Sequence, residues 1–111
     1  MNVKPEFLQK AQQIIKDNDF VMLSKTWCGD CKYTYLVWDE YDIKSKIHII
    51  ELDLFENQTE AEELENAFIQ IAGRKWVPTI FLKGERFDEQ DLKSWEQQGI
   101  LEDKFKHYGL L

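Results

Sequence analysis

The sequence has few of the residues that several large classes of protein require. Its 111 residues include only two cysteines, Cys28 and Cys31, and two histidines, His48 and His107. A structural zinc site needs four ligands, and the two histidines stand alone without ligand spacing, so no metal is expected. No apolar run approaches membrane-spanning length, and residues 1–10 contain no apolar segment of the kind found in secretory signals. We therefore expect a cytoplasmic protein in a reducing compartment.

Positive charge is scarce as well. Lys and Arg number 14 against 21 Asp and Glu, which gives a formal net charge of -7. Nucleic acids and anionic membrane surfaces attract clustered Lys and Arg, so we expect neither as a main partner. The 43% of apolar residues indicates a globular chain. We expect one domain over residues 1–111 that acts as a monomer.

Against this background, the cysteine pair is the most informative feature. Cys28 and Cys31 lie where an apolar run ends and a helical pattern begins. Thiols at positions i and i+3 of a first helical turn share one face and lie close enough to form a disulfide. The positive end of the helix dipole favours a thiolate on the first cysteine, and Lys25 adds positive charge nearby. Cys28 is therefore the predicted nucleophile and Cys31 the predicted resolving thiol.

Two other interpretations of the pair remain open at this point. Two close cysteines are also half of a zinc site, although the other two ligands are not evident. A purely structural disulfide across so short a loop would stabilise the fold little, because its effect grows with loop length.

The apolar pattern predicts alternating helices and strands. The expected elements are a helix over residues 5–15, a strand over 20–23, a helix over 31–41, a strand over 44–53, a helix with a capping box at Thr59 and Glu62 that ends at Gly73, a hairpin in the stretch 74–87 with Pro78 at the first position of its first strand and its turn at Lys83-Gly84, a helix capped by residues 88–91 that ends at Gly99, and a last helix over 101–108. The second to fourth elements form a βαβ unit with parallel strands. The class is α/β, with a mixed four-stranded sheet covered by helices on both faces.

These motifs together resemble a known family. The order of Lys25, Cys28-Gly29-Asp30-Cys31, Val77-Pro78 and the Lys83-Gly84 hairpin is similar to that of the glutaredoxins, which have the thioredoxin fold. The closer resemblance is to the dithiol type, with a thioredoxin-like Trp27 before the first cysteine. It implies an enzyme that reduces protein disulfides or glutathione mixed disulfides through Cys28 and Cys31, with glutathione as reductant.

The resemblance also implies a glutathione site. Pro78 corresponds to the family's cis-proline, and Val77 to the residue whose backbone pairs with the cysteinyl part of glutathione. Lys25 and Lys75 stand where the family binds the glycine carboxylate. Trp27, Gln90 and Asp91 are the remaining expected contacts.

The sequence departs from the family in three places. The family commonly has a Gly-Gly pair near the γ-glutamyl end of glutathione, where this chain has Asp88 and Glu89. Glycine lets a backbone approach a ligand closely, and extra carboxylates repel the γ-glutamyl carboxylate. Trp27 and Trp76 are bulky, and Asp30 places a negative charge between the thiols. These changes predict low activity.

Three rival functions remain. A thioredoxin-like reductase, recharged by thioredoxin reductase, is suggested by Trp27 and the Asp30-Cys31 step. A [2Fe–2S] cluster carrier is suggested by Gly29, which stands where the family usually has proline. The third is a binding module without catalysis, because a fold does not determine a function.

Overall fold

A computed structural model of the chain describes residues 2–111. The elements in order are α1 (Pro5–Asp17), β1 (Phe20–Ser24), α2 (Gly29–Glu40), the 3-10 turn η1 (Lys44–Lys46), β2 (His48–Glu51), the 3-10 turn η2 (Leu52–Leu54), α3 (Gln58–Ala72), β3 (Thr79–Leu82), β4 (Glu85–Phe87), α4 (Glu89–Gln97) and α5 (Leu101–Tyr108). None of the helices in this part of the chain is both long and apolar enough to cross a membrane.

The strands form one mixed sheet in the order β2-β1-β3-β4. β1 and β2 are parallel, whereas β3 is antiparallel to both β1 and β4. The parallel pair is joined through α2, as the predicted βαβ unit requires, and β3 and β4 form the predicted hairpin. The structure thus confirms the mixed four-stranded sheet and the thioredoxin-like fold.

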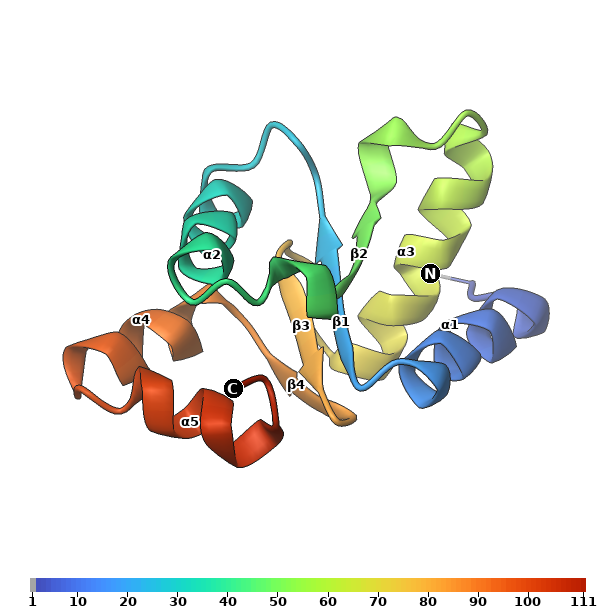
Figure 1. The fold of residues 1–111 in the computed structure, drawn as a ribbon. Coiled ribbons are helices and arrows are strands. Elements are labelled where there is room, and N and C mark those ends of the chain that lie inside the picture. Colours follow the sequence, from blue (N-terminus) through green and yellow to red (C-terminus); the bar gives the residue numbers. More distant parts are fainter. Residues whose placement is uncertain (1) are drawn as a thin grey trace.

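Helices cover both faces of this sheet, and Figure 1 shows α1 and α3 on one face with α2, α4 and α5 on the other. Alternate residues of a strand point to opposite faces, so β1 contributes to two apolar cores. Met22 packs in the core beneath α2, α4 and α5. Val21 and Leu23 pack in the core beneath α1 and α3. The end of β1 is therefore held from both sides, which fixes the start of the loop that carries Cys28.

Two predicted boundaries are wrong. The strand expected over residues 44–53 is limited to β2, because 3-10 turns replace extended backbone on either side of it. The capping box expected at Thr59 does not form. The Asn57 side chain accepts a hydrogen bond from the Glu60 N–H, so α3 is capped two residues earlier than predicted and begins at Gln58. Gly73 ends α3 as predicted, in the left-handed conformation with φ of 68°.

The aromatic packing beneath α5 leads to a stability prediction. Phe105 is fully buried, with its ring centroid 5.8 Å from that of Trp38 and 5.3 Å from that of Tyr41. Phe105→Ala leaves a cavity at this contact and should lower the free energy of unfolding by about 3–5 kcal/mol, measured by denaturant titration. Leu36→Ala, at an exposed position of α2, is the control and should change it by less than about 0.5 kcal/mol. Equal losses in both variants would contradict this packing.

Candidate active site

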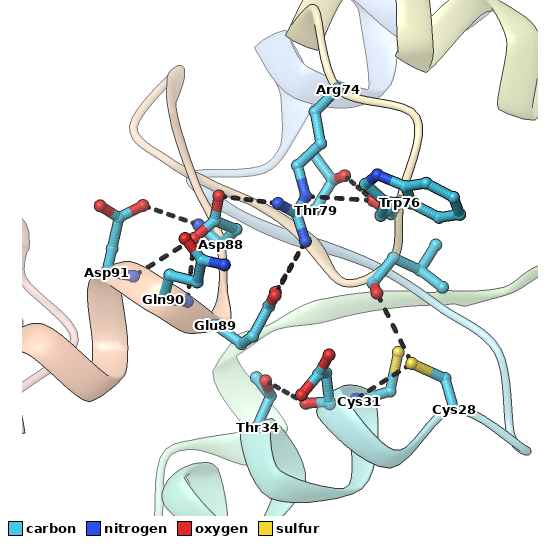
Figure 2. Close-up of polar contacts among 12 residues, drawn as sticks. Cys28, Cys31, Thr34, Arg74, Trp76, Thr79, Asp88, Glu89, Gln90 and Asp91 are labelled. Atoms are coloured by element: carbon cyan, nitrogen blue, oxygen red, sulfur yellow. Dashed lines mark hydrogen bonds and ion pairs between the residues drawn. The ribbon is translucent and has the colours of Figure 1, made fainter.

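The two cysteines lie at the N-terminus of α2, where Cys28 is the N-cap residue. The Cys28 Sγ accepts a hydrogen bond from the Cys31 backbone N–H at 3.4 Å, and the Cys28 thiol donates to the Val77 carbonyl at 3.5 Å. Both thiols are free in this structure, Cys28 partly exposed and Cys31 buried. Figure 2 shows the two sulfur atoms side by side at the start of the helix. The predicted placement of the pair is thus correct.

Burial gives the second thiol a different chemistry from the first. Desolvation raises the pKa of Cys31 to about 12, against an ordinary value of 9.0, while hydrogen bonds from the Lys25 backbone and the Ser24 hydroxyl act in the opposite direction. The folded protein therefore keeps Cys31 protonated at neutral pH. Because the unfolded chain ionises at lower pH, the stabilising effect of this thiol is present below about pH 9.0 and is lost as the pH rises through about 12.

The loop before Cys28 is anchored to the segment that follows β2. Asp53 of η2 accepts hydrogen bonds from both the backbone N–H and the side-chain hydroxyl of Thr26. These bonds lower the pKa of Asp53, the hydroxyl contributing most. A loop that is hydrogen-bonded in this way holds the first cysteine at a constant position relative to the sheet.

The segment before β3 forms the opposite wall of the site. The peptide bond between Val77 and Pro78 is cis, as the family resemblance implied. The Trp76 carbonyl accepts hydrogen bonds from Arg74 Nε at 3.2 Å and from the Thr79 hydroxyl at 3.0 Å. These two contacts hold the segment that presents the Val77 carbonyl to Cys28.

Arg74 also ties this segment to the start of α4, a role that sequence reasoning missed. Its guanidinium contacts Asp88 at 3.0 Å and both carboxylate oxygens of Glu89 at 2.9 Å (Figure 2). The Arg74 side chain is 15% exposed and that of Glu89 is 6% exposed. Such a buried pair is costly to break from one side. Nothing in the local spacing pairs Arg74 with residues 14 and 15 positions later; only the return of the hairpin brings them together.

The N-terminus of α4 is occupied by the chain's own side chains. Asp88 Oδ1 accepts hydrogen bonds from the backbone N–H groups of Gln90 and Asp91 at 2.9 and 3.2 Å. In return, Asp91 Oδ2 accepts from the Asp88 N–H at 2.9 Å, which completes a capping box. The carboxylate of Asp91, predicted as a ligand contact, is therefore engaged within the helix.

A cavity of about 880 Å³ lies beside Cys28, between α3, the segment before β3 and the start of α4. Its lining includes the predicted residues Lys25, Trp27, Cys28, Lys75, Val77 and Gln90. Cys31, Pro78 and Asp91 do not line it. Trp27 and Trp76 are 68% and 67% exposed, so they flank the cavity without closing it.

Two of the three cations around this cavity, Lys25 and Arg74, form ion pairs with carboxylates of the lining. Lys25 Nζ lies 2.9 Å from a carboxylate oxygen of Glu65 on α3. Lys75 Nζ lies 5.9 Å from the centroid of the Trp76 ring. Overall the lining contains five carboxylates, Asp30, Asp53, Glu62, Glu65 and Glu89, against three cations, Lys25, Arg74 and Lys75. Within residues 2–111 no group of three or more His, Cys, Asp or Glu is placed to hold a metal ion.

The comparison with known families agrees with this geometry. The profile of the family described as Glutaredoxin matches residues 20–87, from the first residue of β1 to the last of β4. The chain belongs to the glutaredoxin family. Members of this family are generally thiol-disulfide oxidoreductases, and the match spans both the cysteine pair and the segment before β3.

Individual glutaredoxins are similar over nearly the whole chain. Glutaredoxin-8 of Saccharomyces cerevisiae is 30% identical over 106 residues, which is 95% of this chain and 96% of that protein. The solution structure of a yeast dithiol glutaredoxin superimposes with a TM-score of 0.83 and 30% identity, covering 97% of this chain and 99% of that one. A crystal structure of a buckwheat glutaredoxin–glutathione complex gives a TM-score of 0.78 at 27% identity, covering 96% and 93%.

The difference in exposure between the two thiols predicts selective alkylation. At neutral pH, iodoacetamide should modify Cys28 and leave Cys31 intact in the folded protein, because alkylation requires an accessible thiolate. Intact-mass and peptide mass spectrometry would show one adduct, and unfolding in denaturant should permit the second. Modification of Cys31 at a rate similar to that of Cys28 would contradict the burial described here.

Proposed function

We propose that the protein is a glutathione-dependent thiol-disulfide oxidoreductase in which Cys28 is the nucleophile and Cys31 the resolving thiol. The observation that carries the proposal is the position of Cys28. Its sulfur lies at the N-terminus of α2, receives the Cys31 N–H and faces a cavity large enough for a tripeptide. A helix N-terminus and a backbone N–H both favour negative charge on this sulfur.

The reaction begins when the Cys28 thiolate attacks a disulfide sulfur of the substrate. A bond forms between Cys28 and that sulfur, the substrate disulfide breaks, and the other sulfur leaves as a thiolate that takes a proton from solvent. When the substrate is a glutathionylated thiol, Cys28 keeps the glutathione, and a second glutathione releases it as glutathione disulfide. When the substrate is a protein disulfide, Cys31 attacks Cys28 and the resulting internal disulfide is reduced by two glutathione molecules.

The cavity supplies groups that suit glutathione. The Val77 backbone, beside Cys28, pairs with the cysteinyl part of the tripeptide, and Pro78 holds that backbone in place. Lys25 and Lys75 attract the glycine carboxylate, while Trp27 and Gln90 flank the bound peptide. The buckwheat relative, crystallised as a glutaredoxin–glutathione complex, supports this choice of ligand.

Internal charge pairing accounts for the low activity that we propose. Glutathione carboxylates must compete with Glu65 for Lys25. At the other end of the cavity, the capping box at Asp88 and Asp91 already uses the helix N–H groups that favour an anion. Because carboxylates outnumber cations in the lining, an anionic tripeptide is held weakly.

A second candidate is a thioredoxin-like reductase of protein disulfides. It is favoured by Trp27, which is 68% exposed beside Cys28 and offers an apolar contact to a protein substrate. The oxidised protein would then be reduced by thioredoxin reductase and NADPH rather than by glutathione.

Turnover of a small glutathione mixed disulfide separates the two candidates and tests the roles of both cysteines. With glutathione, glutathione reductase and NADPH, wild type and Cys31→Ser should both turn over, because the single-thiol route needs Cys28 alone. Cys28→Ser should lose activity at least a thousandfold, since no other thiol reaches the cavity. Absence of turnover in wild type, with reduction by thioredoxin reductase, would establish the second candidate instead.

The ion pair between Lys25 and Glu65 predicts a variant with improved binding. Glu65→Gln removes the competing carboxylate, so the KM for the glutathione mixed disulfide should fall about fivefold, in line with about 1 kcal/mol for a partly exposed pair. Glu63→Gln is the matched control, because Glu63 on the same helix pairs with Lys4 away from the cavity. A KM unchanged in Glu65→Gln, or lowered equally in both, would show that Lys25 does not bind the substrate.

A further inference from the structure

The surface around Cys28 exposes large apolar side chains. Across residues 2–111 the exposed large hydrophobic residues are Trp27, Leu36, Leu54, Trp76 and Leu111. Trp27 and Trp76 both line the cavity that Cys28 faces, and Leu54 directly follows Asp53, which also lines it. Proteins that expose such side chains together use them to contact a partner. The surroundings of Cys28 therefore suit a polypeptide as well as a tripeptide.

Both tryptophans already lie beside a cation. Lys25 Nζ is 5.7 Å from the centroid of the Trp27 ring, and Lys75 Nζ is 5.9 Å from that of Trp76. The face of an aromatic ring attracts positive charge, most strongly for tryptophan. Figure 2 shows the Trp76 ring pointing away from the ion pairs of Arg74. Because both tryptophans stay largely exposed with their lysines in place, each can contact a further cationic side chain.

The charge of the cavity also favours a cation. Its lining contains five carboxylates against three cations, a surplus of two negative charges. Glu62 is exposed on α3 and forms no ion pair with any described residue. Asp53 accepts hydrogen bonds from Thr26, which carries no charge. These two carboxylates therefore keep a negative charge that no ion pair offsets.

A bound glutathionyl group increases this surplus. Lys75 is the lining cation without an ion pair in the described part of the chain, and the function proposed above assigns it to the glycine carboxylate. Once Lys75 is engaged, the unpaired charges left around the site are carboxylates, and the tripeptide itself is anionic. The other half of a mixed disulfide thus meets negative charge and exposed indole rings.

We propose that the substrates of this site are glutathionylated proteins whose modified cysteine lies in an exposed segment with Lys or Arg nearby. This proposal rests on the proposed function and names its substrate class. The glutathionyl half occupies the cavity, while basic side chains of the protein half contact Trp27, Trp76 and Glu62. The Cys28 thiolate attacks the glutathione sulfur, the mixed disulfide breaks, and the protein cysteine leaves as a thiolate that takes a proton from solvent.

Charge disfavours the other occupants of this surface. An acidic segment is repelled by the unpaired carboxylates, because like charges brought together at an interface weaken binding. A second copy of this chain has a formal net charge of -7 and is repelled for the same reason. A basic segment is the occupant that complements both the carboxylates and the aromatic rings.

Three peptides of equal length test the substrate class. Each has a central glutathionylated cysteine, flanked by two Lys, two Gln or two Glu residues, and turnover is followed by NADPH consumption with glutathione and glutathione reductase. The rate with glutathione alone is measured for each peptide, because nearby Lys lowers the pKa of the leaving thiol and speeds the uncatalysed reaction. After division by that rate, kcat/KM in wild type should be about tenfold higher for the Lys peptide than for the Gln peptide, and lowest for the Glu peptide. Added NaCl should reduce this preference.

Two variants locate the preference on this surface. Glu62→Gln should reduce the ratio of Lys to Gln peptide about threefold. Glu102→Gln is the matched control: it makes the same change in net charge at an exposed position of α5, outside the cavity, and should leave the ratio unchanged. Trp76→Leu keeps an apolar side chain but removes the aromatic face, so it should slow turnover of the Lys peptide about threefold and change that of the Gln peptide little.

The outcomes separate this proposal from the proposed function. Equal corrected values of kcat/KM for the Lys and Gln peptides would overturn the substrate class and leave the function intact. A preference that survives in both Glu62→Gln and Trp76→Leu, or that falls equally in Glu102→Gln, would also overturn it, since net charge would then be its source.

Turnover of none of the peptides would instead contradict the proposed function. Binding then tests the surface without catalysis, by fluorescence anisotropy of the same peptides, labelled, with the Cys28→Ser protein. The Lys peptide should bind about tenfold more tightly than the Gln peptide, and equal affinities would overturn the proposal.

Discussion

The contact between Cys28 and the Val77 carbonyl joins the two halves of the site, and the remaining features depend on it. It requires the first turn of α2 to sit directly opposite the segment before β3. That position is maintained from both sides. Thr26 is anchored to Asp53, and the Trp76 carbonyl is held by Arg74 and Thr79. Neither side can move far without breaking these hydrogen bonds, so Cys28 is presented to the cavity while Cys31 stays buried.

Ion pairs within the protein reduce the positive charge that the cavity offers to a ligand. The ion pair of Lys25 with Glu65 and that of Arg74 with Glu89 stabilise the walls of the cavity, but they also neutralise cations that an anionic peptide needs. The same conflict occurs at α4, where the N-terminal N–H groups are satisfied by Asp88. Under the proposed function, the ion pairs that stabilise the walls therefore leave fewer cations free to bind the carboxylates of glutathione.

Local patterns in the sequence predicted most of the fold correctly. The apolar run before Cys28 is β1, Gly73 ends α3, and the turn at Lys83-Gly84 connects β3 and β4. Errors occurred where two local signals compete. Asn57 and Thr59 are both suitable N-cap residues. Which of them caps the helix depends on which one has the extended backbone conformation of a cap, and in this protein it is Asn57.

The sequence alone determined the position of the cysteine pair at a helix N-terminus and the succession of helices and strands along the chain, because both follow from short-range periodicity and spacing. Tertiary structure decided which other groups surround the two cysteines. Arg74 contacts Glu89 only because the hairpin returns, and Tyr35 contacts Ser24 only because α2 packs over the end of β1. Contacts between residues far apart in the chain depend on how sheet and helices pack, and no local pattern in a single sequence records that packing. The burial that raises the pKa of Cys31 is likewise a property of the assembled core.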